Sequence, residues 1–331
     1  MFDTQRLDIL ESNASDSVSG SAKDYNEVLS GLRASTPHVS PKWLYDDLGS
    51  ALFEAITRVP EYYPTRCELE ILTTYGDEMG EKLPRNLSVV ELGSGSAQKI
   101  GRLLPQLREP RLYCPIDVSK AALKATVTDI GGRYPKLPVR GAQGDFSDPT
   151  ATATVFRKAM QNGPILLFFP GSTLGNFEPR QAQQLLRGCA QHLPEGTPFL
   201  LGVDLIKTPE LLEAAYDDAA GVTAAFNRNL LAHLNRRFDA DFNLRRWFHE
   251  ARWIPKKQRI EMWLRSCGEQ RIRFGKQTLV FADEEGIHTE NSHKWDRISL
   301  EMLAQQTGWK IDEWWTDRNE WFAEVLLTRL N

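Results

Sequence analysis

The sequence lacks the features of several large protein classes. None of its 331 residues lies in an apolar run of about 18 residues, so we expect no membrane-spanning helix. Lys and Arg (40) are not in excess over Asp and Glu (44), and the formal charge of −4 argues against a dedicated nucleic-acid binder. The N-terminal segment has neither a basic start nor an apolar core, so we do not expect a signal peptide.

Cysteine and histidine are also scarce and widely spaced. The chain has 4 cysteines without a Cys-x-x-Cys pair, and 6 histidines without a His-x-x-x-His pair. This pattern fits neither a disulfide framework nor a zinc site, so we predict no metal. Unpaired, packed thiols favour a cytoplasmic protein. The cysteines are Cys67, Cys114, Cys189 and Cys267.

What the chain does have is a regular alternation of apolar strands and helix-length segments. Hydrophobic residues make up 41% of the sequence and charged residues 25%, as in ordinary globular domains. Segments 120–130 and 179–192 have the pattern of helices that connect such strands. This alternation predicts an α/β fold with a doubly wound, mostly parallel, Rossmann-like sheet. The strands are expected at 88–92, 112–116, 139–145, 164–169 and 198–203.

The alternation stops near residue 206 and resumes near residue 295, which predicts two domains. We expect the sheet domain at 65–205 plus 295–331 and a smaller α+β lobe at 26–64 plus 206–294, after a loose N-terminal arm at 1–25. Ligands of open α/β sheets bind beyond the carboxyl ends of the strands, so we expect the smaller lobe to close over that edge. Thr65 is expected to cap the next helix, with Glu68 as its capping-box partner.

The first strand is followed by Gly93-Ser-Gly95, a turn that lets the backbone approach a ligand closely. Gln98 stands where a dinucleotide fingerprint needs a third glycine, so a nicotinamide cofactor is disfavoured. Acidic residues lie in the first strand (Glu91) and at the ends of the second (Asp117) and third (Asp145). This layout suits a ligand that has an amino-acid moiety and a ribose but no pyrophosphate, as in S-adenosylmethionine-dependent methyltransferases. We expect Glu91 to face the amino-acid end of S-adenosylmethionine, Asp117 its ribose and Asp145 its adenine. A ligand-free tight turn stays an alternative, and helix capping is an equal alternative for Asp117.

Several polar or aromatic clusters follow. Asn176 ends the string GSTLGN and suits a substrate with both an amine and a carboxylate, although an ordinary turn is equally plausible there. Tyr45, Tyr62 and Tyr216 carry polar tips on aromatic rings, with packing as the alternative role. His288–Lys294 holds Glu290 and Ser292, which either lie in a solvated loop or grip a polar ring.

Beyond these patterns, the sequence resembles a known family, the L-histidine Nα-methyltransferases of ergothioneine biosynthesis. The resemblance extends from about residue 40 to residue 317. In place of two small hydroxyl residues common in the family, this chain has Ala97 and Ile100. The matching strings are KWLYDDLGSALFEAITRVPEYYPTR, VVELGSGSAQK, PIDVS, GDF, GSTLGNFEP, LIKTPELLEAAYDDAAGVTAAFNRNLL, IEMWLRS, IHTENSHKW and WWTD.

The resemblance implies transfer of three methyl groups from S-adenosylmethionine to the α-amine of L-histidine, giving hercynine, by a two-lobed monomer. It implies that Tyr45 and Asn176 contact the amine side of histidine and act in catalysis. It implies a carboxylate contact at Tyr216 and ring contacts at Glu290 and Ser292. Further histidine contacts would be Phe53, Tyr62 and Met262, and cofactor contacts Gly93, Lys99, Asp117, Asp145 and Phe146.

Two other functions remain open from the sequence. One is Nα-methylation of a different amino acid such as tryptophan, against which Glu290 and Ser292 argue. The other is a non-catalytic sensor that binds an amino acid or S-adenosylmethionine. A small-molecule substrate, without nucleic-acid or membrane partners, is common to all of these.

Overall fold

The computed structural model describes residues 7–11 and 18–331, with side chains from residue 22 onward. The chain divides into two compact units, described here separately. The first contains Pro64–Ile206 and His293–Asn331 together with strand β1 (Leu7–Glu11). The second contains 18–63 and Lys207–Ser292.

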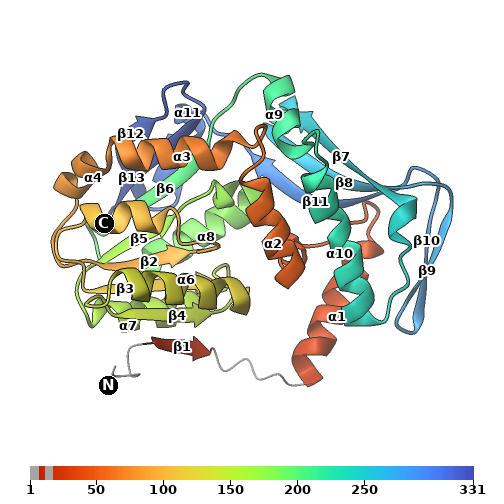
Figure 1. Ribbon diagram of the computed structural model, residues 1–331, viewed down its shortest axis with the longest axis horizontal. Helices are drawn as coiled ribbons and strands as arrows, with labels where there is room; N and C mark the ends of the chain where they lie inside the picture. The colour runs from red at the N-terminus through yellow and green to blue at the C-terminus, as the bar shows by residue number, and fades with distance from the viewer. Residues whose placement is uncertain (1–6, 12–17) are drawn as a thin grey trace. The chain divides into compact units, whose positions relative to one another are not determined.

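The first unit is built on a twisted sheet in the order β1-β4-β3-β2-β5-β6-β13-β12 (Figure 1). Every pair from β1 to β6 is parallel, whereas β13 is antiparallel to both β6 and β12. The central strands β2 and β5 are fully buried, as expected of strands covered on both faces. The other strands are β2 (Ser88–Leu92), β3 (Leu112–Asp117), β4 (Val139–Gln143), β5 (Ile165–Phe169), β6 (Pro198–Asp204), β12 (Trp309–Thr316) and β13 (Phe322–Arg329).

Helices cover both faces of this sheet, which confirms the predicted doubly wound α/β class. Apolar residues of α7, α8 and α11 share one core with the strands, whereas α6 packs against β3 and β4 (Figure 1). Ser119 caps α6 by accepting a hydrogen bond from the Ala122 amide. The helices are α3 (Tyr63–Thr74), α4 (Gly76–Lys82), α5 (Ile100–Leu103), α6 (Lys120–Arg133), α7 (Pro149–Met160), α8 (Pro179–His192) and α11 (Arg297–Gln306), with 3-10 turns η3 (Leu104–Gln106) and η4 (Thr173–Asn176).

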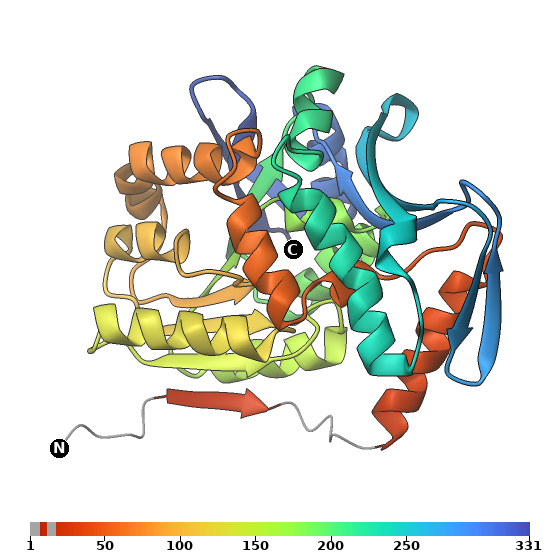
Figure 2. The same cartoon turned by 45° about the vertical axis from the view of Figure 1, so that its right-hand side comes forward.

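The second unit combines helices with small sheets. Strands β7 and β8 are antiparallel, β11 lies on the other side of β8, and β9 and β10 form a separate hairpin. Helix α1 lies beside this hairpin, where the Tyr25 hydroxyl donates to the Phe274 carbonyl (Figure 2). The elements are α1 (Val18–Leu32), η2 (Pro41–Leu44), α2 (Asp47–Ile56), α9 (Pro209–Tyr216), α10 (Val222–Phe238), η5 (Leu244–Arg246), β7 (Trp247–Ile254), η6 (Pro255–Lys257), β8 (Arg259–Ser266), β9 (Gln270–Phe274), β10 (Gln277–Phe281) and β11 (Gly286–His293).

Two details differ from the sequence-based expectations. Within the expected N-terminal arm, Leu7–Glu11 pairs in parallel with β4 and α1 begins at Val18, so these parts have regular structure. The capping box expected at Thr65 is wrong, because α3 begins at Tyr63 and Glu68 makes different contacts, described below. Among the described helices, none combines the length and apolarity that crossing a membrane requires.

Candidate active site

The sheet of the first unit reverses its strand order between β2 and β5, and ligands of such sheets bind at this point. The loop after β2 contains Gly93 and Gly95, both with positive φ (70° and 46°). A side chain at Gly93 would meet the Phe146 ring at 3.3 Å, whereas nothing lies within 4 Å of the equivalent position at Gly95. The loop therefore leaves an open backbone cradle beside Phe146.

Asp117, at the end of β3, is 8% exposed and holds two backbone amides. Its carboxylate oxygens accept from Gly95 N at 2.9 Å and from Ser119 N at 2.8 Å. Burial raises the pKa of Asp117, although these two amide bonds oppose the rise. The cap of α6 is Ser119 and not Asp117, whose carboxylate instead holds the Ser119 amide and the glycine loop.

Asp145 and Phe146 follow β4. The exposed Asp145 carboxylate accepts from the amide and the hydroxyl of Ser147, at 2.9 and 2.6 Å. The Phe146 ring packs edge-on against Phe169 at 5.3 Å and Phe177 at 6.1 Å. These contacts fix a half-buried aromatic ring next to Gly93, and the ligand contact of Asp145 stays a prediction.

Lys99 is held by a buried carboxylate that the sequence-based reasoning assigned elsewhere. Glu68 on α3 is fully buried, and one of its oxygens lies 2.5 Å from Lys99 Nζ. Its other oxygen accepts from Gly171 N at 2.7 Å, in the loop after β5. Glu68 therefore connects the loops that follow β2 and β5. The sequence did not indicate this role, because Glu68 has the spacing of a capping-box partner of Thr65, whereas Lys99 and Gly171 lie 31 and 103 residues away.

Glu91 lies in the interior of the first unit. It is fully buried in β2 and accepts a hydrogen bond from the Tyr113 hydroxyl on β3. Burial raises the pKa of Glu91 well above its ordinary value. The contact expected between Glu91 and the amino-acid end of S-adenosylmethionine stays a prediction.

Asn176 ends the 3-10 turn η4 in the loop after β5. The backbone turns sharply there, with Gly171 and Ser172 both at positive φ (81° and 55°). The Ser172 hydroxyl accepts from Asp204 N at 2.9 Å and so ties the loop to β6. This bracing places a half-buried Asn176 at the carboxyl edge of the sheet.

In the second unit, four of the predicted substrate residues form a continuous row of aromatic rings. Tyr45 packs edge-on against Phe53 (5.7 Å), Phe53 against Tyr62 (6.2 Å) and Tyr62 against Tyr216 (6.1 Å). Phe226 of α10 contacts both Tyr45 and Phe53, and sequence reasoning missed it because it looks like an ordinary core position of a helix. The row presents apolar ring faces together with several hydroxyl groups.

The polar end of this row lies on β8 and β11. The Tyr216 hydroxyl and the Ser292 hydroxyl are hydrogen-bonded at 2.6 Å. Glu290 and Ser292 are both buried and lie two residues apart on β11, so they share one face of the strand. Met262 lies on the neighbouring strand β8, where its carbonyl accepts from the Thr289 hydroxyl at 3.1 Å. The structure thus brings together the substrate residues predicted for this unit.

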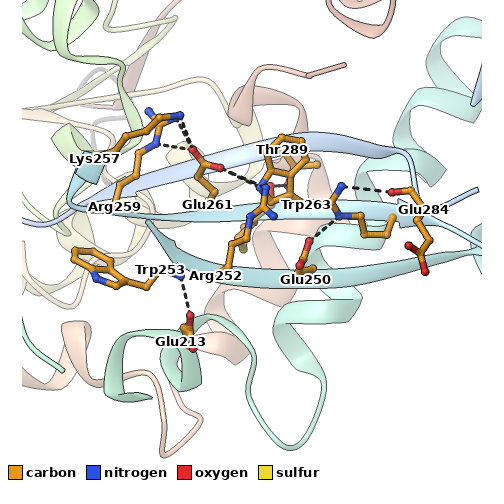
Figure 3. A network of polar contacts seen from close by, with 12 residues as sticks. Glu213, Glu250, Arg252, Trp253, Lys257, Arg259, Glu261, Trp263, Glu284 and Thr289 are labelled. Carbon is orange, nitrogen blue, oxygen red and sulfur yellow. Dashed lines mark hydrogen bonds and ion pairs between the residues drawn. The ribbon is translucent and has the colours of Figure 1, made fainter. Parts of the chain in front are cut away.

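Next to Met262, β8 carries a charged network (Figure 3). Glu261 accepts from Arg259 at 2.6 Å and from Lys257 at 3.2 Å. Burial raises its pKa, but the hydrogen bonds from these two cations outweigh burial and lower the pKa to about 2. The Arg252 and Arg265 guanidinium groups lie 4.9 and 4.8 Å from the Trp263 ring. This network stabilises the strand rather than offering a reactive group.

Residues 24–329 match the protein family described as "Histidine-specific methyltransferase, SAM-dependent". The chain belongs to this family. A protein of Mycolicibacterium smegmatis named histidine N-alpha-methyltransferase is 40% identical over 296 residues, covering 88% of this chain and 90% of that protein. Ergothioneine biosynthesis protein 1 of Neurospora crassa is 27% identical, over 86% of this chain and 32% of that protein. The 4-dimethylallyltryptophan N-methyltransferase of Claviceps purpurea is 24% identical, over 94% of each chain.

The geometry of the first unit fits the methyl donor of this family. The open backbone at Gly95 leaves room for a ligand, and Lys99, paired with Glu68, lies in the same loop. Asp117 at the end of β3 and the Phe146 ring complete the set. Among the described residues, no group of three or more metal-binding side chains is arranged around a common point.

Proposed function

We propose that this histidine-specific methyltransferase transfers three methyl groups from S-adenosylmethionine to the α-amine of L-histidine, giving hercynine, within ergothioneine biosynthesis. The observation that carries the proposal is the row of aromatic rings ending in the Tyr216–Ser292 hydrogen bond, with Glu290 on the same strand face as Ser292. The 40% identity to a protein named for this activity supports it.

S-adenosylmethionine, when bound, supplies a methyl group that is already activated for displacement. The protein must therefore hold the amine in line and in its uncharged form. We assign amine contacts to Tyr45 and Asn176, and the carboxylate contact to Tyr216. Before each methylation the ammonium form of the amine loses one proton, and water can carry that proton away, so no strong base is required.

Ring specificity is assigned to β11. Glu290 and Ser292 can hydrogen-bond the two imidazole nitrogens, while Phe53, Tyr62 and Met262 surround the ring. For the donor we assign Gly93, Lys99, Asp117, Asp145 and Phe146. A cytoplasmic location completes the proposal, supported by four cysteines without disulfides. The proposed state of the protein is a monomer.

The deciding experiment is to incubate the purified protein with S-adenosylmethionine and one amino acid, and to follow product mass. With L-histidine we expect three successive gains of one methyl group each. Methylation of L-tryptophan alone would favour the alternative amino-acid methyltransferase. Tight binding of both ligands without any mass gain would favour a sensor, and either result would overturn the proposal.

A further inference from the structure

Tyr216 is fixed at its main chain as well as at its hydroxyl. It ends α9, and its carbonyl oxygen lies 2.8 Å from Nε2 of His249 on β7. The His249 side chain is only 1% exposed. Because α9 ends at Tyr216 and α10 begins at Val222, the helical ladder does not continue across this turn, and the contact from β7 supplies a support that the helix does not.

The hydrogen-bond partners define the state of the His249 ring. A carbonyl oxygen only accepts, so Nε2 carries the hydrogen and donates to Tyr216. Nδ1 then has a free lone pair and accepts from Asn227 Nδ2 at 2.9 Å. The same Asn227 nitrogen donates to the Trp263 carbonyl at 3.0 Å, and Asn227 is fully buried. The chain of contacts therefore links α10, β7 and the end of α9 through a neutral imidazole.

Three charged groups lie near the His249 ring, in the turn after α9 and on α10. Asp217 has a carboxylate oxygen 4.0 Å from Nε2, Asp218 holds the amides at the start of α10, and Arg228 lies on α10. Burial lowers the pKa of His249, although the Tyr216 carbonyl and Asp217 oppose this effect. A proton added at Nδ1 would face the Asn227 amide hydrogens and would break that hydrogen bond.

We propose that neutral His249, oriented by Asn227, is a positioning residue for Tyr216 and thereby for recognition of the substrate carboxylate. The inference rests on the proposed function, in which Tyr216 receives that carboxylate. His249 acts through Tyr216, because its nearly unexposed side chain has both ring nitrogens engaged within the protein.

Two near-isosteric variants test the contacts of the two ring nitrogens separately, that of Nε2 with Tyr216 and that of Nδ1 with Asn227. In His249→Gln the amide nitrogen reaches the position of Nε2 and can still donate to Tyr216. In His249→Asn the shorter side chain keeps a partner for Asn227 but does not reach Tyr216. We expect the histidine KM to rise about tenfold or more in H249N and to stay within about threefold in H249Q, since one hydrogen bond is worth roughly this much.

The affinity for S-adenosylhomocysteine is the internal control, and we expect it to change by less than about twofold in both variants. The pH dependence adds a second test. As the pH falls through the lowered pKa of His249, which lies below the ordinary value of about 6.5, the histidine KM of the wild type should rise relative to that of H249Q, because only the wild type can protonate this ring. The titration of the substrate is common to both proteins and cancels in the ratio.

Equal histidine KM values in both variants and the wild type would overturn the inference while leaving the proposed function intact. An equal loss of donor and histidine affinity in both variants would reduce His249 to a scaffold residue and overturn it too. Failure of the wild type to methylate histidine would overturn the proposed function itself. Should either variant not fold, ¹⁵N spectra of the wild type decide, since a hydrogen on Nδ1 of His249 at pH 7 contradicts the link.

Discussion

At the scale of single residues, Glu290 has the clearest expected effect on substrate choice. A buried carboxylate that binds a ring N–H discriminates strongly against analogues that lack this N–H group. With such an analogue bound, the carboxylate is left without a hydrogen-bond partner. We expect Glu290→Ala to lower the ratio of kcat/KM for histidine over tryptophan by about tenfold or more. Competition assays with both amino acids measure this ratio. The exposed Glu269 provides a matched control, and an unchanged ratio in E290A would refute the role.

Asn176 is expected to affect the amino acid and not the donor. Replacement by alanine removes an amide that we assign to the amine side of histidine, while the Ser172–Asp204 hydrogen bond that fixes the loop remains. We expect the histidine KM to rise about tenfold or more, and the Kd for S-adenosylhomocysteine to change by less than about threefold. Asn162→Ala, in the turn after α7, is the control. An equal loss of both affinities would contradict this assignment.

The carboxyl pair Glu68 and Glu324 should respond unequally to the same substitution. Burial and the neighbouring Glu68 raise the pKa of Glu324 well above its ordinary value, which favours its neutral form, whereas Glu68 is paired with Lys99. We expect E324Q to keep nearly the wild-type Tm, and E68Q to lose about 3 kcal/mol because Lys99 is left without its carboxylate. Thermal unfolding at pH 7 tests this. Equal effects of the two substitutions would contradict the assignment of the negative charge to Glu68 and of the neutral form to Glu324.

The same pair gives a dependence on pH with a definite sign. Because the folded pKa of Glu324 lies above its unfolded value, the wild type loses stability as the pH rises between these two values. The variant E324Q has no such group. Its Tm relative to the wild type should therefore increase from pH 5 to pH 8, and a decrease would contradict the neutral state of Glu324.

At the scale of elements, the charged network on β8 should change stability with pH in the opposite direction to Glu324. The folded pKa of Glu261, about 2, lies below its unfolded value. Its contribution to stability is therefore present above about pH 4.5 and is lost as the pH falls toward 2, by about 1–2 kcal/mol after solvent screening. E261Q should be less stable than the wild type at pH 7, and the difference should shrink by pH 3. A constant difference would refute it.

Helices and strands were predictable from the sequence where a single local pattern determines the secondary structure. The apolar strands at β2 and β5 and the helices α6 and α8 follow from periodicity and burial. Glu68 was misassigned because its spacing from Thr65 imitates a capping box, whereas the buried position of Glu68 is set by its distant partners Lys99 and Gly171.

At the scale of the whole molecule, the two ligands should protect different parts of the chain. The residues that we assign to the donor lie in the first unit. Those that we assign to histidine lie in the second, except Asn176. In hydrogen exchange we expect S-adenosylhomocysteine to protect the loops at 93–99 and 144–147. Histidine should protect the segments around Tyr62, Tyr216 and β11, together with the loop at 171–176.

A control for this experiment is the β9–β10 hairpin, which carries none of the assigned residues and should exchange at the same rate with either ligand. Protection of β11 by the donor analogue alone would contradict the assignment of Glu290 and Ser292 to histidine.

The sequence by itself determined the α/β class and the family, because strand periodicity and long ordered motifs depend on neighbouring residues. The tertiary structure alone decided that Glu91 turns inward to Tyr113, that Glu68 holds Lys99, and that His249 supports Tyr216. These contacts join residues 22 to 33 positions apart, on different elements. Their formation depends on packing that brings those elements together and excludes water, which no local pattern encodes.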